Sequence, residues 1–370
     1  MQHDVIDQAR ASEAPEELSV EKRGSLALIT LNRPRALNAL NVAMRRKVAD
    51  TYPRLAREPT NYAVVIQSAG GKAFCAGGDV RELVSLGRED QAQARGACAE
   101  EYALNWQLEC FFKPTVSLID GVAMGSGVGI SLYGTHRVAG ERYRFAMPET
   151  GIGLFPDDGV SWAFARMPDA IGMYLALTGR PIGRADAYRL GLVTHCIPAD
   201  RFGEIRAGLA AADTVDPLLD DRHQDPGPGE LEALRPAIAR CFSDNTVEGI
   251  VDRLRSERGA SATWAQGVVE DLAARSPTSL KITHRHVQLA RNLDLRAALI
   301  QDFRLGCRCL EGDDFYEGVR AALIDRDQAP RWRPGRLEDV SEAVVEAYFA
   351  SLGAKELDLP SRARMQAFGP

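Results

Sequence analysis

Two carboxylates, Glu149 and Asp157, lie in the otherwise apolar and glycine-containing stretch F-A-M-P-E-T-G-I-G-L-F-P-D at 145–157. Glycines and Pro156 between or beside them exclude one regular helix, but a turn could bring both acids into one pocket. A carboxyl group in apolar surroundings has a raised pKa, which suits acid–base chemistry near neutral pH. Taken singly, Glu149 could be an acid in the first turn of a helix, and Asp157 an ordinary turn residue.

Two glycine-rich segments follow strand-like sequence and could present backbone N–H groups to a ligand. They are G-G-K-A-F-C-A-G-G-D at 70–79 and G-S-G-V-G at 125–129, and the second matches neither the dinucleotide-binding fingerprint nor a P-loop. If both turns faced one carbonyl oxygen, their amides would form an oxyanion hole, in which one donor contributes about 3 kcal/mol to the transition state. Each segment alone could instead be a simple turn or a close helix contact.

Positioning these segments requires strands that end immediately before them. Runs of apolar residues bounded by glycine, proline or polar residues predict strands over 26–32, 63–67, 115–124, 136–139, 143–147 and 193–197. Helices are predicted from Asn38, as an N-cap, through Tyr52 and over 91–112. Strands that alternate with helices imply parallel pairing through crossover helices, and therefore an α/β fold.

The pattern changes beyond residue 200, which separates three parts of the chain. Residues 20–200 carry the α/β pattern of a core, and residues 213–230, rich in Asp, Pro and Gly, predict an exposed loop. Residues 231–370 predict a helical C-terminal region, with breaks at 243–245 and 276–277 and a short helix over 342–352.

The composition excludes several classes of function. The chain has 370 residues, 45% hydrophobic and 26% charged, and its net charge of −6 gives no electrostatic footprint for nucleic acid. No apolar run reaches the roughly 18 residues that a membrane span needs. Seven scattered cysteines and a start that matches no secretory or transit peptide predict a cytoplasmic location. Two lone pairs, Cys307 with Cys309 and His284 with His286, predict structural cysteines and surface histidines rather than a metal site.

The three segments, in this order, resemble the signature regions of the crotonase (enoyl-CoA hydratase/isomerase) superfamily. K-A-F-C-A-G-G-D at 72–79, G-V-A-M-G-S-G-V-G at 121–129 and the stretch at 145–157 carry the resemblance, which runs over residues 26–198. Within the superfamily, the third motif and D-F-Y-E-G-V-R-A-A-L-I-D-R-D-Q-A-P-R-W at 314–332 are similar to those of 3-hydroxyisobutyryl-CoA hydrolases. The resemblance implies a crotonase-like ββα spiral core that binds CoA, followed by a helical C-terminal region.

By their positions in these motifs, the resemblance also implies roles for single residues. The amides of Gly78 and Ser126 would bind the thioester oxygen, Glu149 and Asp157 would be the catalytic carboxylates, and Glu101 would contact the acyl group. The nucleotide end of CoA would contact Arg33, Ala36, Leu37, Lys72 and Ala76. No metal or redox cofactor is implied, because CoA arrives as part of the substrate.

One position bears on the choice between hydrolysis and hydration. Hydratases of the superfamily use two glutamates, and the second would fall at Gly129, which offers no carboxylate. We therefore predict hydrolysis of a short 3-hydroxyacyl-CoA, such as 3-hydroxyisobutyryl-CoA, in which Glu149 attacks the carbonyl or deprotonates a water. The alternatives are an enoyl-CoA hydratase/isomerase that uses Glu149 alone, or a non-catalytic acyl-CoA-binding protein.

Two departures from the superfamily pattern concern the acyl group. Ser126 stands where glycine is usual, so its hydroxymethyl group could crowd the thioester. D-D-G-V-S-W at 157–162 replaces a more glycine-rich continuation, so Asp158 could raise the pKa of Asp157, and Trp162 could narrow the pocket.

Because crotonase relatives commonly form trimers or hexamers, we expect a homo-oligomer with an acyl-CoA substrate and no nucleic-acid or membrane partner.

Overall fold

Two β-sheets lie at the centre of the part of the protein that the computed structural model describes, residues 16–367. The larger sheet has the order β1-β2-β3-β5-β7-β10, and the smaller has the order β4-β6-β8-β9. The strands of the larger sheet are β1 (Leu18–Arg23), β2 (Leu26–Leu31), β3 (Ala63–Ser68), β5 (Thr115–Ile119), β7 (His136–Ala139) and β10 (His195–Cys196). Those of the smaller sheet are β4 (Ala73–Cys75), β6 (Val122–Met124), β8 (Arg144–Ala146) and β9 (Ile182–Gly183).

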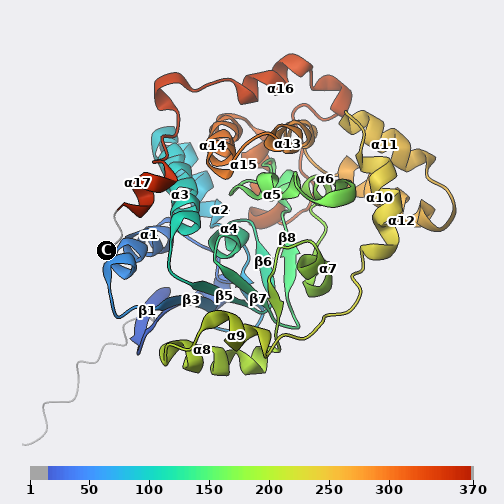
Figure 1. The fold of residues 1–370 in the computed structure, drawn as a ribbon. Helices are drawn as coiled ribbons and strands as arrows, with labels where there is room; N and C mark the ends of the chain where they lie inside the picture. Colours follow the sequence, from blue (N-terminus) through green and yellow to red (C-terminus); the bar gives the residue numbers. More distant parts are fainter. Residues whose placement is uncertain (1–15, 368–370) are drawn as a thin grey trace, which may run out of the picture.

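The larger sheet is parallel from β2 to β10 and is buried on both faces, as its nearly continuous apolar strands require. On β2, Leu26 and Leu28 face one hydrophobic cluster, while Ala27, Ile29 and Leu31 face the other. The first cluster is completed by α8 (Phe202–Ala210) and α9 (Val215–Asp220). Figure 1 shows these two helices beneath the larger sheet.

The chain passes three times from the larger sheet to the smaller sheet and then to a helix. The units are β3-β4-α2, β5-β6-α4 and β7-β8-α5, where the helices are α2 (Val80–Glu89), α4 (Ser126–Leu132) and α5 (Val160–Phe164). Strands β4, β6 and β8 pair in parallel, so their carboxyl ends lie at the same edge of the smaller sheet. The three segments that follow these strands therefore meet at this edge, in the ββα arrangement that the motifs implied.

Helices flank the two sheets (Figure 1). They include α1 (Val42–Arg57), α3 (Gln91–Cys110), α6 (Ile171–Thr178) and α7 (Arg184–Arg189) from the N-terminal half. The predicted helical C-terminal region comprises α10 (Arg235–Phe242), α11 (Val247–Ser256), α12 (Ala262–Ala273), α13 (Pro277–Ala290), α14 (Leu295–Glu311), α15 (Asp314–Val319), α16 (Glu342–Phe349) and α17 (Arg362–Gln366). Helix α14 packs on α3, and Figure 1 shows α13, α14 and α15 opposite α8 and α9.

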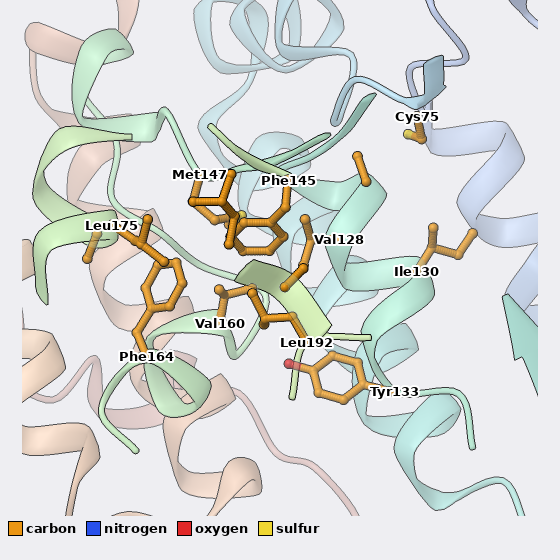
Figure 2. Close-up of a cluster of buried hydrophobic side chains, with 14 of the residues drawn as sticks. Cys75, Val128, Ile130, Tyr133, Phe145, Met147, Val160, Phe164, Leu175 and Leu192 are labelled. Carbon is orange, nitrogen blue, oxygen red and sulfur yellow. The ribbon is translucent and has the colours of Figure 1, made fainter. Parts of the chain in front are cut away.

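A cluster of apolar side chains supports the strands of the smaller sheet (Figure 2). Val128 of α4, Phe145 of β8 and Phe164 of α5 are buried in it. The rings of Phe145 and Phe164 meet edge to face, with their centroids 6.0 Å apart, which adds a favourable aromatic contact to the burial of their area. Tyr133 belongs to the same cluster and donates its hydroxyl hydrogen bond to the carbonyl of Asp158, which links the cluster to the turn after Asp157.

Among the predicted elements whose bounds differ in the structure, two differ for a clear structural reason. The strand predicted over 115–124 is divided into β5 and β6, which belong to different sheets. Gly121 makes this possible, because its φ is +108° and a Cβ there would lie 2.7 Å from the carbonyl oxygen of Lys72. The helix predicted from Asn38 begins at Val42, and its N-cap is Asn41, whose side chain accepts a hydrogen bond from the backbone.

The segment 213–230 is not a continuous exposed loop, so that prediction is wrong in part. It contains α9, because Val215, Leu218 and Leu219 are apolar enough to pack against the larger sheet. Within residues 16–367, we find no helix with both the length and the apolar character needed to cross a bilayer.

Phe164→Ala should lower the free energy of unfolding by about 3–5 kcal/mol, because it leaves a cavity in the cluster of Figure 2. Urea unfolding followed by circular dichroism measures the change. The matched control is Phe112→Ala, since 44% of Phe112 is exposed and its removal should cost below about 1 kcal/mol. Equal losses in the two variants would contradict the assignment of this cluster as the core behind the site.

Candidate active site

A cavity of about 220 Å³ opens at the carboxyl ends of β4, β6 and β8. Its wall contains all five residues that were predicted to touch the reactive end of a thioester: Gly78, Glu101, Ser126, Glu149 and Asp157. They come from four segments of the chain, because Glu149 and Asp157 share the stretch 145–157. The strand order of the smaller sheet brings three of these segments together.

Gly78 and Ser126 lie side by side in the cavity wall. A Cβ built on Gly78 would lie 2.8 Å from Oγ of Ser126, so the two turns touch. Each turn depends on a glycine with positive φ, Gly77 at +116° and Gly125 at +47°. Within residues 16–367, neither the N–H of Gly78 nor that of Ser126 donates a hydrogen bond to a backbone carbonyl. Two unpaired donors from adjacent turns are the arrangement that an oxyanion hole requires.

Glu149 follows β8 and begins the short 3₁₀ helix Glu149–Ile152. Its side chain is buried, and its Oε2 atom has no hydrogen-bond partner among the described residues. Burial raises the pKa of Glu149 well above its usual range, and the negative charge of Asp157 raises it further. A Cβ built on Gly125 would lie 3.1 Å from Oε1 of Glu149, so this carboxyl group is next to the second oxyanion turn.

Asp157 also lines the cavity and accepts a hydrogen bond of 2.8 Å from the hydroxyl of Tyr102. Burial raises the pKa of Asp157 to about 8, with further contributions from the charges of Glu101 and Asp302. Burial also raises the pKa of the neighbouring Asp158, and the negative charge of Asp157 raises it further. The site therefore holds two buried acids, Glu149 and Asp157, whose pKa values are both raised, as suits groups that transfer protons.

Glu101 projects from α3 into the cavity wall and is held from two sides. Its Oε2 accepts a 2.6 Å hydrogen bond from Nη1 of Arg45, and its Oε1 accepts one from the hydroxyl of Ser126. The hydroxyl group of Ser126, which was expected to crowd the thioester, thus points to Glu101 and has a hydrogen-bond partner there.

The residues predicted to contact the nucleotide end of CoA lie less close together. Ala76 lines the cavity, and its N–H donates to the carbonyl of Leu37. Ala36, Leu37 and Lys72 are exposed outside the cavity wall. The guanidinium of Arg33 is engaged within the protein, with Asp79 at 3.1 Å and Glu17 at 2.9 Å, so binding of a phosphate by Arg33 would require these ion pairs to open.

Several residues near the site were missed by sequence reasoning. Arg45 lies on the face of α1 that also carries Val48 and Tyr52, and this position was the available signal that its side chain is buried. Tyr102 follows Glu101 on α3 and could have been noted as a partner for an acid. Leu323 reaches the cavity from 320–324, the segment that resembled the hydrolases at the sequence level.

A buried network from the C-terminal helices supports the turn that carries Asp157. Oδ2 of Asp302 accepts a 2.6 Å hydrogen bond from the N–H of Gly159, and Oδ1 is 2.5 Å from Nε2 of His286. Gln301 lies 2.8 Å from the other ring nitrogen of His286. His284 and His286 are both buried, so the prediction of surface histidines is wrong, because α13 is covered by neighbouring helices.

Trp162 does not narrow the cavity, contrary to the sequence prediction. Its indole N–H donates to the carbonyl of Leu293, and its ring stacks under the guanidinium of Arg166 at 4.1 Å. The first turn of α5 directs this side chain toward the α13–α14 connection instead of toward β8.

Cys307 and Cys309 are buried in α14 as free thiols, and no group of His, Cys, Asp and Glu side chains within 16–367 is arranged to hold a metal ion.

Comparison with known proteins places this arrangement in a family. The model of the enoyl-CoA hydratase/isomerase family matches residues 26–349 of the chain. The chain belongs to this family. The crotonase resemblance predicted from three motifs is thereby confirmed, and so are the fold class and the helical C-terminal region.

Curated relatives match nearly the whole chain. The mitochondrial 3-hydroxyisobutyryl-CoA hydrolase of Rattus norvegicus is 40% identical over 95% of this chain and 94% of that protein. The corresponding protein of Homo sapiens is 38% identical over 94% of this chain and 92% of that protein. These relatives are mitochondrial, so the prediction of a cytoplasmic location, which rested on the cysteines and on the N-terminal sequence, is wrong by this comparison.

Solved structures share the fold over the same length. A carnitinyl-CoA dehydratase from Mycobacterium thermoresistibile superimposes with a TM-score of 0.87 at 37% identity, covering 93% of this chain and 98% of that one. An enoyl-CoA hydratase from Rhodobacter sphaeroides 2.4.1 also has a TM-score of 0.87, at 36% identity, covering 93% of this chain and all of that one. The larger sheet, the smaller sheet and the C-terminal helices are thus shared as one unit.

Asp157→Asn should raise the free energy of unfolding at about pH 8 by about 1–2 kcal/mol, although it replaces a carboxyl group of the site with an amide. The pKa of Asp157 is higher in the folded protein than in the unfolded chain, so the wild type loses stability as pH rises from about 4 to about 8. Asparagine does not ionise, so the stability of the variant does not fall in this way as pH rises. Urea unfolding at about pH 5 and about pH 8 measures it, and a difference between the two proteins that does not grow with pH would contradict the raised pKa.

Proposed function

We propose that the protein hydrolyses a short 3-hydroxyacyl-CoA thioester of the 3-hydroxyisobutyryl-CoA type to the free acid and CoA. Curated 3-hydroxyisobutyryl-CoA hydrolases at about 40% identity over most of the chain support this substrate class. The observation that carries the chemistry is the meeting of two unpaired amides, from Gly78 and Ser126, with two buried acids in one small cavity.

The proposed mechanism starts with the thioester carbonyl oxygen between the two amides. When a nucleophile adds to the carbonyl carbon, negative charge develops on this oxygen, and the amides of Gly78 and Ser126 stabilise it without reorganisation. The N-terminus of α4, which begins at Ser126, adds the positive end of its dipole. Collapse of the tetrahedral intermediate breaks the carbon–sulfur bond, and the CoA thiolate then takes up a proton.

Two routes for the nucleophile are compatible with the cavity. In the first, the carboxylate of Glu149 attacks and forms a mixed anhydride, which water then hydrolyses. In the second, Glu149 removes a proton from a water that attacks directly. Asp157 lies in the same wall, and in both routes we assign it the task of orienting water or transferring a proton, with Tyr102 holding its carboxylate in place.

We further propose that the protein works without a metal or redox cofactor and assembles as a trimer or hexamer. CoA would enter as part of the substrate, and its nucleotide would extend past Ala76 toward Leu37 and Lys72.

A second candidate activity is enoyl-CoA hydration or isomerisation. It is favoured by the two solved structures that share the fold, which are described as a carnitinyl-CoA dehydratase and an enoyl-CoA hydratase.

Glu149→Gln should reduce thiol release from 3-hydroxyisobutyryl-CoA at least about a hundredfold, because the amide can neither attack nor accept a proton. A thiol-reactive dye measures the release of CoA. Crotonyl-CoA is the control substrate, whose conjugated double bond is followed by its ultraviolet absorbance. Wild-type protein that consumes the double bond but frees no thiol from a panel of 3-hydroxyacyl-CoAs would replace this proposal with the second candidate.

The value of kcat/KM should rise as pH increases from about 6 to about 9, because the acids must ionise to act and burial raises the pKa of both. In Asp157→Asn, the remaining activity should show its rising limb at lower pH, since the variant removes the charge that raises the pKa of Glu149. A pH–rate profile of each protein measures the shift. The proposed coupling of Glu149 and Asp157 would be contradicted if the rising limb of the profile lay at the same pH in both proteins. A wild-type kcat/KM that falls between about pH 6 and about pH 9 would also contradict it.

A further inference from the structure

A charged pair lies in the wall of the cavity beside the oxyanion turns. Nη1 of Arg45 donates a 2.6 Å hydrogen bond to Oε2 of Glu101, and the two side chains are 8% and 11% exposed. Both residues line the cavity. A Cβ built on Gly78 would lie 3.7 Å from Nη1 of Arg45, so the ion pair lies next to the turn that carries the first oxyanion donor.

The energetics of this pair argue for a role other than stability. Removing a guanidinium and a carboxylate from water costs several kcal/mol for each ion, and buried pairs are often no better than apolar residues of the same volume. The pair is also incompletely satisfied, because Nε of Arg45 is buried without a hydrogen-bond partner among the described residues. An ion pair that lines a cavity, rather than being enclosed on all sides by protein, is suited to a polar group on a ligand.

The two charges together define which polar group fits. Arg45 offers only donors, and Glu101, as a carboxylate, offers only acceptors. A hydroxyl group can accept from the first and donate to the second. A substrate carboxylate would be repelled by the negative charge of Glu101. An alkyl group would remove water from the ion pair without replacing the hydrogen bonds that the water makes. Ser126 strengthens this arrangement, because its hydroxyl already donates to Oε1 of Glu101 and holds the carboxylate in place.

We propose that Arg45 is a specificity-determining residue which, with Glu101, binds the hydroxyl group of the acyl chain next to the thioester. This inference rests on the proposed function for the identity of the acyl group. Arg45 contributes a hydrogen bond to the hydroxyl oxygen and orients Glu101 to accept the hydroxyl proton. Its short separation from Gly78 restricts the recognised hydroxyl to the first few carbons of the chain.

The test is a comparison of binding, which separates the inference from turnover. Stable thioether analogues of 3-hydroxyisobutyryl-CoA and isobutyryl-CoA differ only in the hydroxyl group, and calorimetry gives a Kd for each. The wild type should bind the hydroxyl analogue at least about tenfold more tightly, as expected for hydrogen bonds to charged groups. Arg45→Met should reduce this ratio at least about tenfold, mainly by weakening the binding of the hydroxyl analogue.

Arg46→Met is the matched control, because Arg46 is the next residue of α1 and forms an exposed ion pair with Glu100 that lies outside the cavity. This variant should keep the wild-type ratio. Arg45→Lys provides a second test if Arg45→Met does not fold, and it should bind the hydroxyl analogue with an intermediate ratio, since the charge remains but the planar fork is lost.

The outcomes separate the two proposals. A wild-type protein that binds both analogues equally, or folded Arg45 variants that keep the wild-type ratio, would overturn the inference. A selective ratio that depends on Arg45, in a protein that frees no thiol from the thioesters, would leave the inference standing and overturn the proposed hydrolysis.

Discussion

The parallel pairing of β4, β6 and β8 is the constraint on which the site depends. Because these strands run in the same direction, the turns that follow them emerge at one edge. There the N–H groups of Gly78 and Ser126 have no backbone acceptor in the described part of the chain. Glycines at 77 and 125 permit the positive φ that both turns require. Antiparallel pairing of these strands would send neighbouring turns to opposite ends of the sheet. The chemistry therefore follows from sheet topology rather than from any one side chain.

The acids beside these amides lower the stability of the fold, and the C-terminal helices make their burial possible. Burial raises the pKa values of Glu149, Asp157 and Asp158, so the folded protein holds carboxyl groups that the unfolded chain would ionise freely. Asp302 on α14 fixes the turn after Asp157 through the N–H of Gly159. The C-terminal region is thus part of the site, and the match of the family across residues 26–349 agrees with this.

Much of this was accessible from sequence, where a local pattern existed. The strands before each motif were predictable from their apolar runs, and the three motifs together identified the family. The split at Gly121 was not predictable, because it depends on the approach of the Lys72 carbonyl, 49 positions earlier in the chain. The partner of Arg45 was not predictable either, because its place on α1 signals burial but does not reveal the ion pair with Glu101 on α3. Contacts between distant segments leave no local signal.

The central claim is that two main-chain amides polarise the carbonyl group of a bound thioester. Vibrational difference spectroscopy of an acyl-CoA labelled with carbon-13 at the thioester carbonyl, bound to the Glu149→Gln protein, measures this polarisation directly. Binding between the amides of Gly78 and Ser126 should move the isotope-sensitive carbonyl stretch to lower frequency than in water, because hydrogen bonds weaken the carbon–oxygen double bond. A band at or above the frequency in water would show that the amides do not bind this oxygen, and the account would be wrong.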